Sequence, residues 1–244
     1  MKIKHIVIED NIEPNTPIAL SNKQQHYLKN VLRKKDHDLI KVNAKNGICI
    51  AKILDINSTP AIIVAEKIEE KVQSNKIRIH LYQSLCQQKK MDLIVQKATE
   101  LGVNQITPII TNRSKIKIES DEKELRKITR LKEIATNACQ QSHNPETPII
   151  NKISNINSIL IKKEDLSIAL QPGVEYTLHS FEPPDSDTDI NIFIGPEGGF
   201  DNYELNKLTD YGVHLVKFGP RVLRCETAAI SVIAALNVIW GDCK

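Results

Sequence analysis

The sequence predicts an α/β protein in which a mostly parallel sheet, with helices on both faces, follows a small β-rich domain. Up to about residue 70 the chain contains short apolar runs that are typical of strands. From Ile77 onward, strand-like runs alternate with helical patterns, and this alternation indicates a parallel sheet. A polar, charged run from Glu69 to Lys76 separates the two regions. We therefore expect a first domain over residues 1–70, a linker over 71–76 and a second domain over 77–244.

The composition narrows the class of protein. The net charge of the 244 residues is only +3, which does not require a nucleic-acid partner, and 4% aromatic residues argue against a base-stacking platform. Five scattered cysteines without a C-x-x-C pair argue against a zinc site and a disulfide scaffold. No N-terminal segment resembles a signal peptide, and the near-apolar run over 227–240 is shorter than the ~20 residues of a membrane span. We expect a cytoplasmic protein with no metal and no membrane contact.

Strand patterns dominate the first domain. We expect strands over residues 3–8, 39–42, 48–53 and 61–66. Ser21 is a suitable N-cap for a helix that runs to Arg33. The dipeptide Asn46-Gly47 lies between two strands and is typical of a two-residue hairpin turn.

The second domain alternates between the two patterns. Strands are expected over residues 77–85, 105–110, 166–170, 191–194 and 214–218. Helices are expected over residues 91–101, 121–141 and 227–240, with a further polar helix between the last two strands. Gly102 is placed to end the first of these helices. The helix over 227–240 is apolar on nearly every face, so we expect it to be buried.

Two loops rich in glycine and proline are the candidate ligand site. One is GPEGG at residues 195–199, and the other starts at Gly219-Pro220 and leads into an R-x-x-R-x-E-T cluster. Both follow a strand and precede a helix, where open α/β sheets bind small ligands. Gly198 and Gly199 can adopt positive φ, whereas Pro196 stiffens the turn. Neither loop matches a phosphate-binding motif, and Glu197 favours a neutral or cationic cofactor over a phosphate.

The same loops resemble the C-terminal signature of the RsmE-type 16S rRNA (uridine-N3) methyltransferases of the SPOUT superfamily. GPEGGF at 195–200 and FGPRVLRCETA at 218–228 carry this resemblance. The segments 26–33, 96–103 and 111–114, and Gln141-Ser142 with Pro148, are similar to further motifs of the family, in the same order. The chain departs from the family pattern at Gln87, Gln140 and Asn144.

The resemblance implies a SPOUT-type parallel sheet with a C-terminal trefoil knot, preceded by a PUA-like β-barrel that binds RNA. It implies a homodimer that methylates N3 of a uridine in 16S rRNA of the small ribosomal subunit, with S-adenosyl-L-methionine (SAM) as cofactor. Two other functions stay open. One is a non-catalytic ribosome-binding factor that retains the fold, and the other is a nucleotide-dependent oxidoreductase, for which the fingerprint glycines are missing.

The resemblance also implies site residues. The cofactor would lie among Leu170, Gln171, Pro172, Gly195, Pro196, Glu197, Gly198, Gly199, Phe218, Gly219, Val222, Leu223, Arg224 and Thr227. Arg224 is the candidate that stabilises charge on the uridine, and Glu226 is the candidate base. As structural alternatives, Arg224 would pair with Glu226 or Glu197, and Glu226 would only favour the helix start. The candidate RNA contacts are His26, Arg33, Lys34, Lys35, Arg113, Lys115 and Arg221.

Overall fold

The computed structural model describes residues 5–8, 10–44, 46–70, 77–116, 120–142, 144, 146–185 and 188–243. The chain divides into two compact units, one formed by residues 1–74 with 139–147 and the other by residues 75–138 with 148–244. The linker expected over 71–76, and the first two residues of the strand expected over 3–8, lie outside the described residues.

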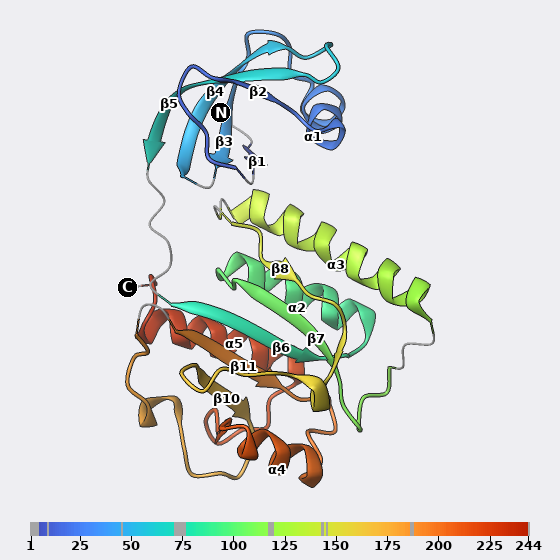
Figure 1. Ribbon diagram of the computed structural model, residues 1–244, viewed down its shortest axis with the longest axis vertical. Helices are drawn as coiled ribbons and strands as arrows, with labels where there is room; N and C mark the ends of the chain where they lie inside the picture. The colour runs from blue at the N-terminus through green and yellow to red at the C-terminus, as the bar shows by residue number, and fades with distance from the viewer. Residues whose placement is uncertain are drawn as a thin grey trace. The chain divides into compact units, whose positions relative to one another are not determined.

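The first unit is built on a five-stranded sheet, blue to cyan in Figure 1. Its strand order is β1 (His5–Ile8), β3 (Leu39–Ala44), β4 (Gly47–Asp55), β5 (Ile62–Glu70) and β2 (Pro17–Ala19). The β1–β3 pair is parallel and the other three pairs are antiparallel. Leu28, Ile40 and Ile63 are fully buried in its core. The β-rich character expected of this region is confirmed.

The helix of the first unit is shorter than expected. Ser21 caps α1 (Asn22–His26) as predicted, because its hydroxyl accepts from Gln24 N at 3.3 Å and the Gln24 side chain accepts from Ser21 N at 2.8 Å. One π-helical turn, η1 (Tyr27–Val31), follows. Arg33, at φ +51°, is in a left-handed conformation that a right-handed helix does not contain, so the helix ends before it.

The hairpin turn lies one residue earlier than expected. Ala44 pairs with Gly47 across β3 and β4, so Gly47 belongs to the strand and the two connecting residues are 45 and 46. Lys45 lies outside the described residues. The Asn46 side chain accepts from Ile12 N at 2.9 Å and donates to Ile12 O at 2.8 Å. Asn46 therefore also holds the loop around Ile12, and a local turn pattern does not predict this contact.

The second unit is built on a sheet in which every pair of strands is parallel, where the sequence predicted a mostly parallel sheet. Its strand order is β12 (His214–Val216), β10 (Leu166–Leu170), β11 (Asp189–Ile194), β6 (Arg78–Ser84), β7 (Gln105–Ile110) and β8 (Ile149–Ile150), with β9 (Ser154–Asn155) also paired to β7. The short strands β2, β8 and β9, of two or three residues each, were not predicted.

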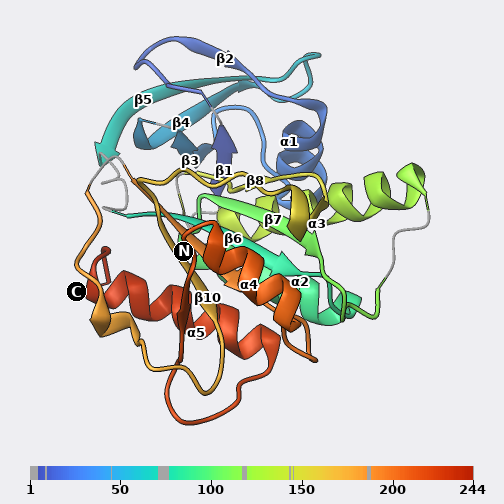
Figure 2. The same ribbon diagram turned by 60° about the horizontal axis from the view of Figure 1, so that its bottom comes forward.

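Helices cover both faces of this sheet, as Figures 1 and 2 show. On one face, α2 (Gln88–Glu100), α3 (Asp121–Ser142) and α5 (Cys225–Ile239) contribute to a core that includes Leu81, Ile192 and Ile233. On the other face, α4 (Asn202–Asp210) packs through Leu208 on a smaller cluster that includes Phe193. Two 3₁₀ turns, η2 (Ile156–Ser158) and η3 (Leu178–Ser180), complete the described elements.

The apolar helix at the C-terminal end is buried, as expected. Within α5, Val232, Ile233 and Leu236 are fully buried. No helix among the described residues is long and apolar enough to cross a membrane.

Candidate functional site

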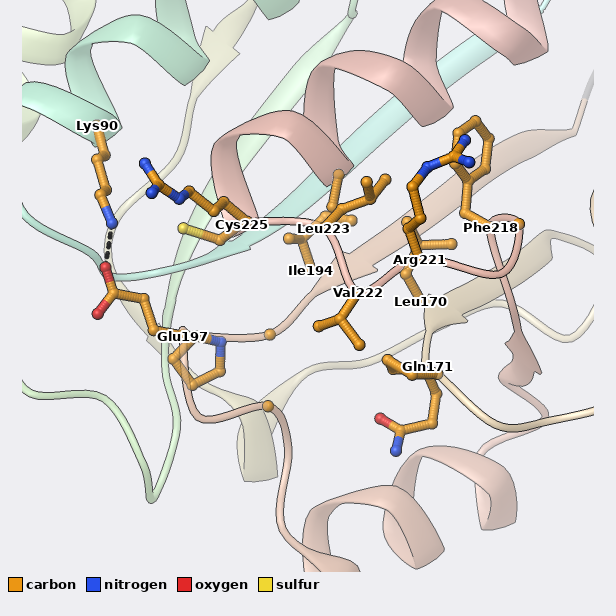
Figure 3. Close-up of a pocket in the computed structure, with 17 residues that line it drawn as sticks. Lys90, Leu170, Gln171, Ile194, Glu197, Phe218, Arg221, Val222, Leu223 and Cys225 are labelled. Atoms are coloured by element: carbon orange, nitrogen blue, oxygen red, sulfur yellow. Dashed lines mark hydrogen bonds and ion pairs between the residues drawn. The ribbon is translucent and has the colours of Figure 1, made fainter.

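A cavity of about 310 Å³ lies where three loops of the second unit meet (Figure 3). The loops follow β10, β11 and β12, which are neighbours in the parallel sheet. Parallel neighbours bring their carboxyl ends to the same edge, and this edge is where open α/β sheets bind ligands. The position of the pocket follows from the strand order.

The structure brings most of the expected cofactor residues together. Of the fourteen, only Gly198 and Thr227 do not line this pocket. The pocket is also lined by Arg221, which was expected to contact RNA. Four other lining residues were not expected: Lys90, Ile194, Cys225 and Ala228. Three of these flank the two loops in sequence, whereas Lys90 comes from the first turn of α2 and carried no recognisable signal.

The GPEGG loop owes its shape to a tight turn. Gly199 N donates to Pro196 O at 2.9 Å, and Gly199 adopts φ +67°, which favours glycine. A Cβ atom on Gly195 would lie 3.3 Å from the Phe200 ring and from Phe200 N. The loop therefore favours glycine at 195, where a side chain would crowd Phe200, and at 199, where the backbone conformation is left-handed.

An ion pair spans the pocket between α2 and the GPEGG loop. Lys90 Nζ donates to Glu197 Oε1, drawn as the dashed line in Figure 3, and lies 3.9 Å from Glu226 Oε2. This hydrogen bond raises the pKa of Lys90 and is the main cause that lowers the pKa of Glu197. The charges of Lys115 and Arg224 lower the Glu197 pKa further. Glu197 is therefore a carboxylate at neutral pH.

Glu226 lies in the first turn of α5 and does not line the pocket. Its side chain is 14% exposed, and burial on its own raises its pKa. Its own backbone N–H, the Cys225 thiol at 3.3 Å, and the charges of Lys90 and Arg224 outweigh that effect, so the pKa is lowered overall. The group is thus ionised at neutral pH, and its lowered pKa makes it a weaker base than an ordinary glutamate.

Arg224 is the N-cap residue of α5 and lines the pocket with an exposed side chain. Its charge lowers the pKa of Glu197 and of Glu226. Within the described part of the chain, its guanidinium forms no ion pair with either carboxylate. The arginine therefore acts on them through space and keeps its hydrogen-bond donors available.

A pair of buried thiols adjoins the pocket. Cys225 lines it, and Cys86 follows β6. The hydrogen bond between the two thiols lowers the pKa of Cys225 and raises that of Cys86. Among the described residues, no group of three or more His, Cys, Asp and Glu side chains is placed to hold a metal ion.

The residues expected to contact RNA fall into two groups. His26 lies in α1 and Arg33, Lys34 and Lys35 lie beyond η1, all within the first unit. Arg113 and Lys115 follow β7, and Arg221 lines the pocket, all within the second unit. Most are exposed, but Arg113 has a contact that was not expected, because its Nη1 donates to Gly198 O at 2.9 Å. Gln87, where the chain departs from the family pattern, is the exposed N-cap residue of α2.

Family models identify the class of protein to which this fold and this pocket belong, the RNA methyltransferases. Residues 73–237 match the RNA methyltransferase domain, and residues 20–66 match the RNA methyltransferase PUA domain. The chain is 33% identical over 247 residues to ribosomal RNA small subunit methyltransferase E of Buchnera aphidicola subsp. Schizaphis graminum, covering 99% of this chain and 98% of the relative. It is 32% identical over 249 residues to the protein of that name from Rickettsia conorii, covering 100% and 99%. The chain belongs to the family of ribosomal RNA small subunit methyltransferase E.

Solved structures agree in fold over nearly the whole chain. A Legionella pneumophila protein described as a methyltransferase, in complex with bound SAM, superposes with a TM-score of 0.88 at 28% identity, covering 99% of this chain and 100% of that one. Ribosomal RNA small subunit methyltransferase E from Neisseria gonorrhoeae, bound to SAM, gives 0.88 at 25% identity with the same coverage. An α/β methyltransferase unit with a PUA-like unit is therefore the fold of this chain.

Proposed function

We propose that this protein is a SAM-dependent methyltransferase that methylates N3 of one uridine in 16S rRNA of the small ribosomal subunit. The observation that carries the proposal is the pocket formed by the GPEGG loop and the Phe218–Arg224 segment, in a chain whose family is named for small-subunit ribosomal RNA methylation. Two full-length structural relatives with bound SAM support the choice of cofactor.

The pocket residues suit SAM. Leu170, Ile194 and Leu223 provide apolar surface for an adenine ring, and the glycines of the loops allow close approach to backbone groups. The Glu197 carboxylate is compatible with a cationic ligand. The volume of about 310 Å³ lies within the usual range for ligand pockets. When bound, SAM supplies the methyl group.

The protein must also make uridine N3 nucleophilic, because N3 carries a proton and attacks only after that proton leaves. Loss of the proton places negative charge on the uracil oxygens. Arg224 is the proposed source of compensating charge, since its guanidinium lies at the pocket without an ion-pair partner among the described residues. Glu226, held as a carboxylate, is the proposed proton acceptor.

RNA capture is proposed for the N-terminal domain together with the rim of the catalytic domain. We keep the boundaries 1–70, 71–76 and 77–244 for domain, linker and catalytic domain. Arg33, Lys34 and Lys35 would bind phosphates from the first unit, and His26 would assist them. Arg113, Lys115 and Arg221 would bind phosphates from the second unit, which also holds the pocket. Phosphate contacts position an RNA without reading its sequence.

We further propose that the C-terminal segment forms the trefoil knot of the SPOUT superfamily and that the protein is a homodimer located in the cytoplasm, where ribosomal RNA is found. The exposed apolar side chain of Val238, near the C-terminal end of α5, supports a partner surface there. Light scattering at micromolar concentration should give twice the 27.5 kDa of one chain. A 27.5 kDa species alone would contradict the dimer.

Methyl transfer from labelled SAM to purified small subunits tests the proposed function. The subunits should come from cells that lack this modification, with fully modified subunits as the control. Label on a single uridine, mapped by nuclease digestion and mass spectrometry, is the expected result. Binding to the subunits without any methyl transfer would favour the non-catalytic ribosome-binding factor instead.

A further inference from the structure

The turn after β7 is held to residues 198–201, at the end of the GPEGGF segment, by side chains that have no role in the chemical step above. Asn112 Nδ2 donates to Asp201 Oδ2 at 2.7 Å, and Arg113 Nη1 donates to Gly198 O at 2.9 Å and to Phe200 O at 3.3 Å. The Asn112 hydrogen bond is the main cause of a lowered pKa at Asp201. The two segments are about 90 residues apart in sequence and behave as one structural element.

The buried side chain of Glu204 also links the turn after β7 to Asp201. The side chain is fully buried, and each of its carboxylate oxygens accepts one backbone N–H. Oε1 accepts from Asn112 N at 2.7 Å, and Oε2 accepts from Asp201 N at 2.9 Å. A carboxylate can serve both donors, whereas the amide of glutamine has only one oxygen. Glu204 therefore holds both segments in a way that glutamine cannot reproduce.

The turn that carries Arg113 is itself anchored to the sheet. Ser114 N donates to Thr111 O at 3.0 Å, and the hydroxyls of Thr111 and Ser114 each lie 3.0 Å from the hydroxyl of Ser84, at the end of β6. The Cβ and Cδ atoms of Arg113 would each lie 3.5 Å from a Cβ placed on Gly198. Arg113 thus packs against the cofactor loop, and the turn that carries it is held to the end of β6 by hydrogen bonds.

The guanidinium of Arg113 has a second edge. Its two Nη1 hydrogens serve the Gly198 and Phe200 carbonyls. The Nε and Nη2 groups carry the remaining three N–H donors of this exposed side chain. Among the described residues, these three donors have no hydrogen-bond partner. An arginine edge of this geometry binds a phosphate through two parallel hydrogen bonds. The side chain can therefore hold the loop and an RNA phosphate at the same time.

We propose that Arg113 couples RNA binding to cofactor binding, and that Glu204 and Asn112 are positioning residues that keep the GPEGG loop attached to it. This inference rests on the proposed function. A phosphate on the outer edge fixes the guanidinium, which in turn fixes the two loop carbonyls beside the cofactor pocket. By thermodynamic linkage, RNA and cofactor must then raise each other's affinity by the same factor.

The coupling factor is measured as the ratio of two dissociation constants. Calorimetry on the full-length protein gives the affinity for S-adenosylhomocysteine, a cofactor analogue with no methyl group to transfer, with and without an unmodified small-subunit rRNA transcript. We expect the transcript to tighten binding of the analogue by roughly fivefold or more in the wild type. Arg113→Ala should bring this factor to about one, and Arg113→Lys should restore little of it, because an ammonium lacks the fork.

Arg126→Ala is the matched control, because Arg126 is also exposed but pairs with Glu122 on α3. It should keep the coupling factor of the wild type. An Arg113→Ala variant with the same factor as the wild type would overturn the proposal. A wild-type factor of one, with both ligands bound, would overturn the coupling and leave the proposed function standing. Failure of the wild type to bind the cofactor analogue at all would overturn the proposed function instead.

The positioning role is tested without RNA. Glu204→Gln should weaken binding of the cofactor analogue by about tenfold, since one buried backbone N–H loses its acceptor. Asn112→Ala removes an exposed side chain and provides a second test if Glu204→Gln does not fold. Each variant is compared with the wild type at a temperature well below its own melting transition. Unchanged affinity in both variants would refute the positioning role.

Discussion

His80 should make the stability of the catalytic unit depend on pH. Its ring is largely buried on β6, stacked on Tyr82 with ring centroids 4.0 Å apart, and its Nε2 lies 2.7 Å from the Thr107 hydroxyl. Burial lowers the pKa of His80 from 6.5 to about 4, against the opposing charge of Asp165. The ring is therefore neutral in the folded protein at neutral pH.

The sign of the effect follows from which state takes up the proton. Between pH 6.5 and about 4 the unfolded chain binds a proton at this histidine and the folded chain does not. The free energy of unfolding must fall as the pH falls through this window. At about 1.4 kcal/mol for each tenfold change in proton affinity, the difference between 6.5 and about 4 corresponds to roughly 3 kcal/mol. That is a large share of the usual stability of a domain.

Urea unfolding of the wild type and of His80→Gln tests this prediction, because glutamine keeps a polar group and cannot titrate. Acid weakens both proteins through their carboxylates, so the informative quantity is the difference between their free energies of unfolding. Between about pH 7.5 and about pH 4, we expect the wild type to lose roughly 3 kcal/mol more of its free energy of unfolding than His80→Gln loses. A difference that stays constant with pH would refute the assignment of a neutral, buried imidazole.

Three further changes probe the pocket. Arg224→Ala should lower the single-turnover rate on saturating subunits by about 10²–10³-fold with little change in SAM affinity, and a collapse of affinity at an unchanged rate would show a structural role instead. Lys90→Met removes the hydrogen bond that lowers the Glu197 pKa, so on acidification the affinity for SAM should begin to fall at a higher pH than in the wild type. An unchanged pH dependence of the SAM dissociation constant would show that Glu197 does not contribute to binding. Gly199→Ala, at φ +67°, should lower the free energy of unfolding by about 1–2 kcal/mol in chemical denaturation, whereas Gly198→Ala should have a smaller effect, and equal losses would show that the turn has no special need for glycine at 199.

Local sequence located two of the three pocket loops, whereas the loop after Leu170 came only from the family resemblance. Glycine and proline at strand ends are visible without a structure, and the sheet brings the two loops and Leu170 together because β10 lies between β11 and β12. Lys90 could not be found in this way. It reaches the site because β6 lies beside β11, which brings the first turn of α2 to the same sheet edge as the GPEGG loop. Strand order places Lys90 at the pocket, and a local sequence pattern does not contain the strand order.

Other differences come from contacts between distant segments. The helix that was expected to reach Arg33 ends early through a π-helical turn, although every residue from Asn22 onward is acceptable in a helix. Arg113 was expected only to contact RNA, and its hydrogen bonds to Gly198 and Phe200 depend on the meeting of two loops. Glu204 resembles an ordinary residue of a helical first turn, and its role appears only through Asn112 on another loop.

The position of β6 inside the sheet has a consequence for synthesis of the chain. One edge of β6 pairs with β7, which follows soon after, whereas its other edge pairs with β11, which emerges about a hundred residues later. At a translation rate of about 5–20 residues per second, that edge waits for roughly 5–20 s. During this interval a strand with several buried apolar side chains has an unpaired backbone, and such an edge can pair with another chain. The nascent protein is therefore most exposed to aggregation between the emergence of β7 and that of β11, and chaperone dependence should be concentrated in this interval.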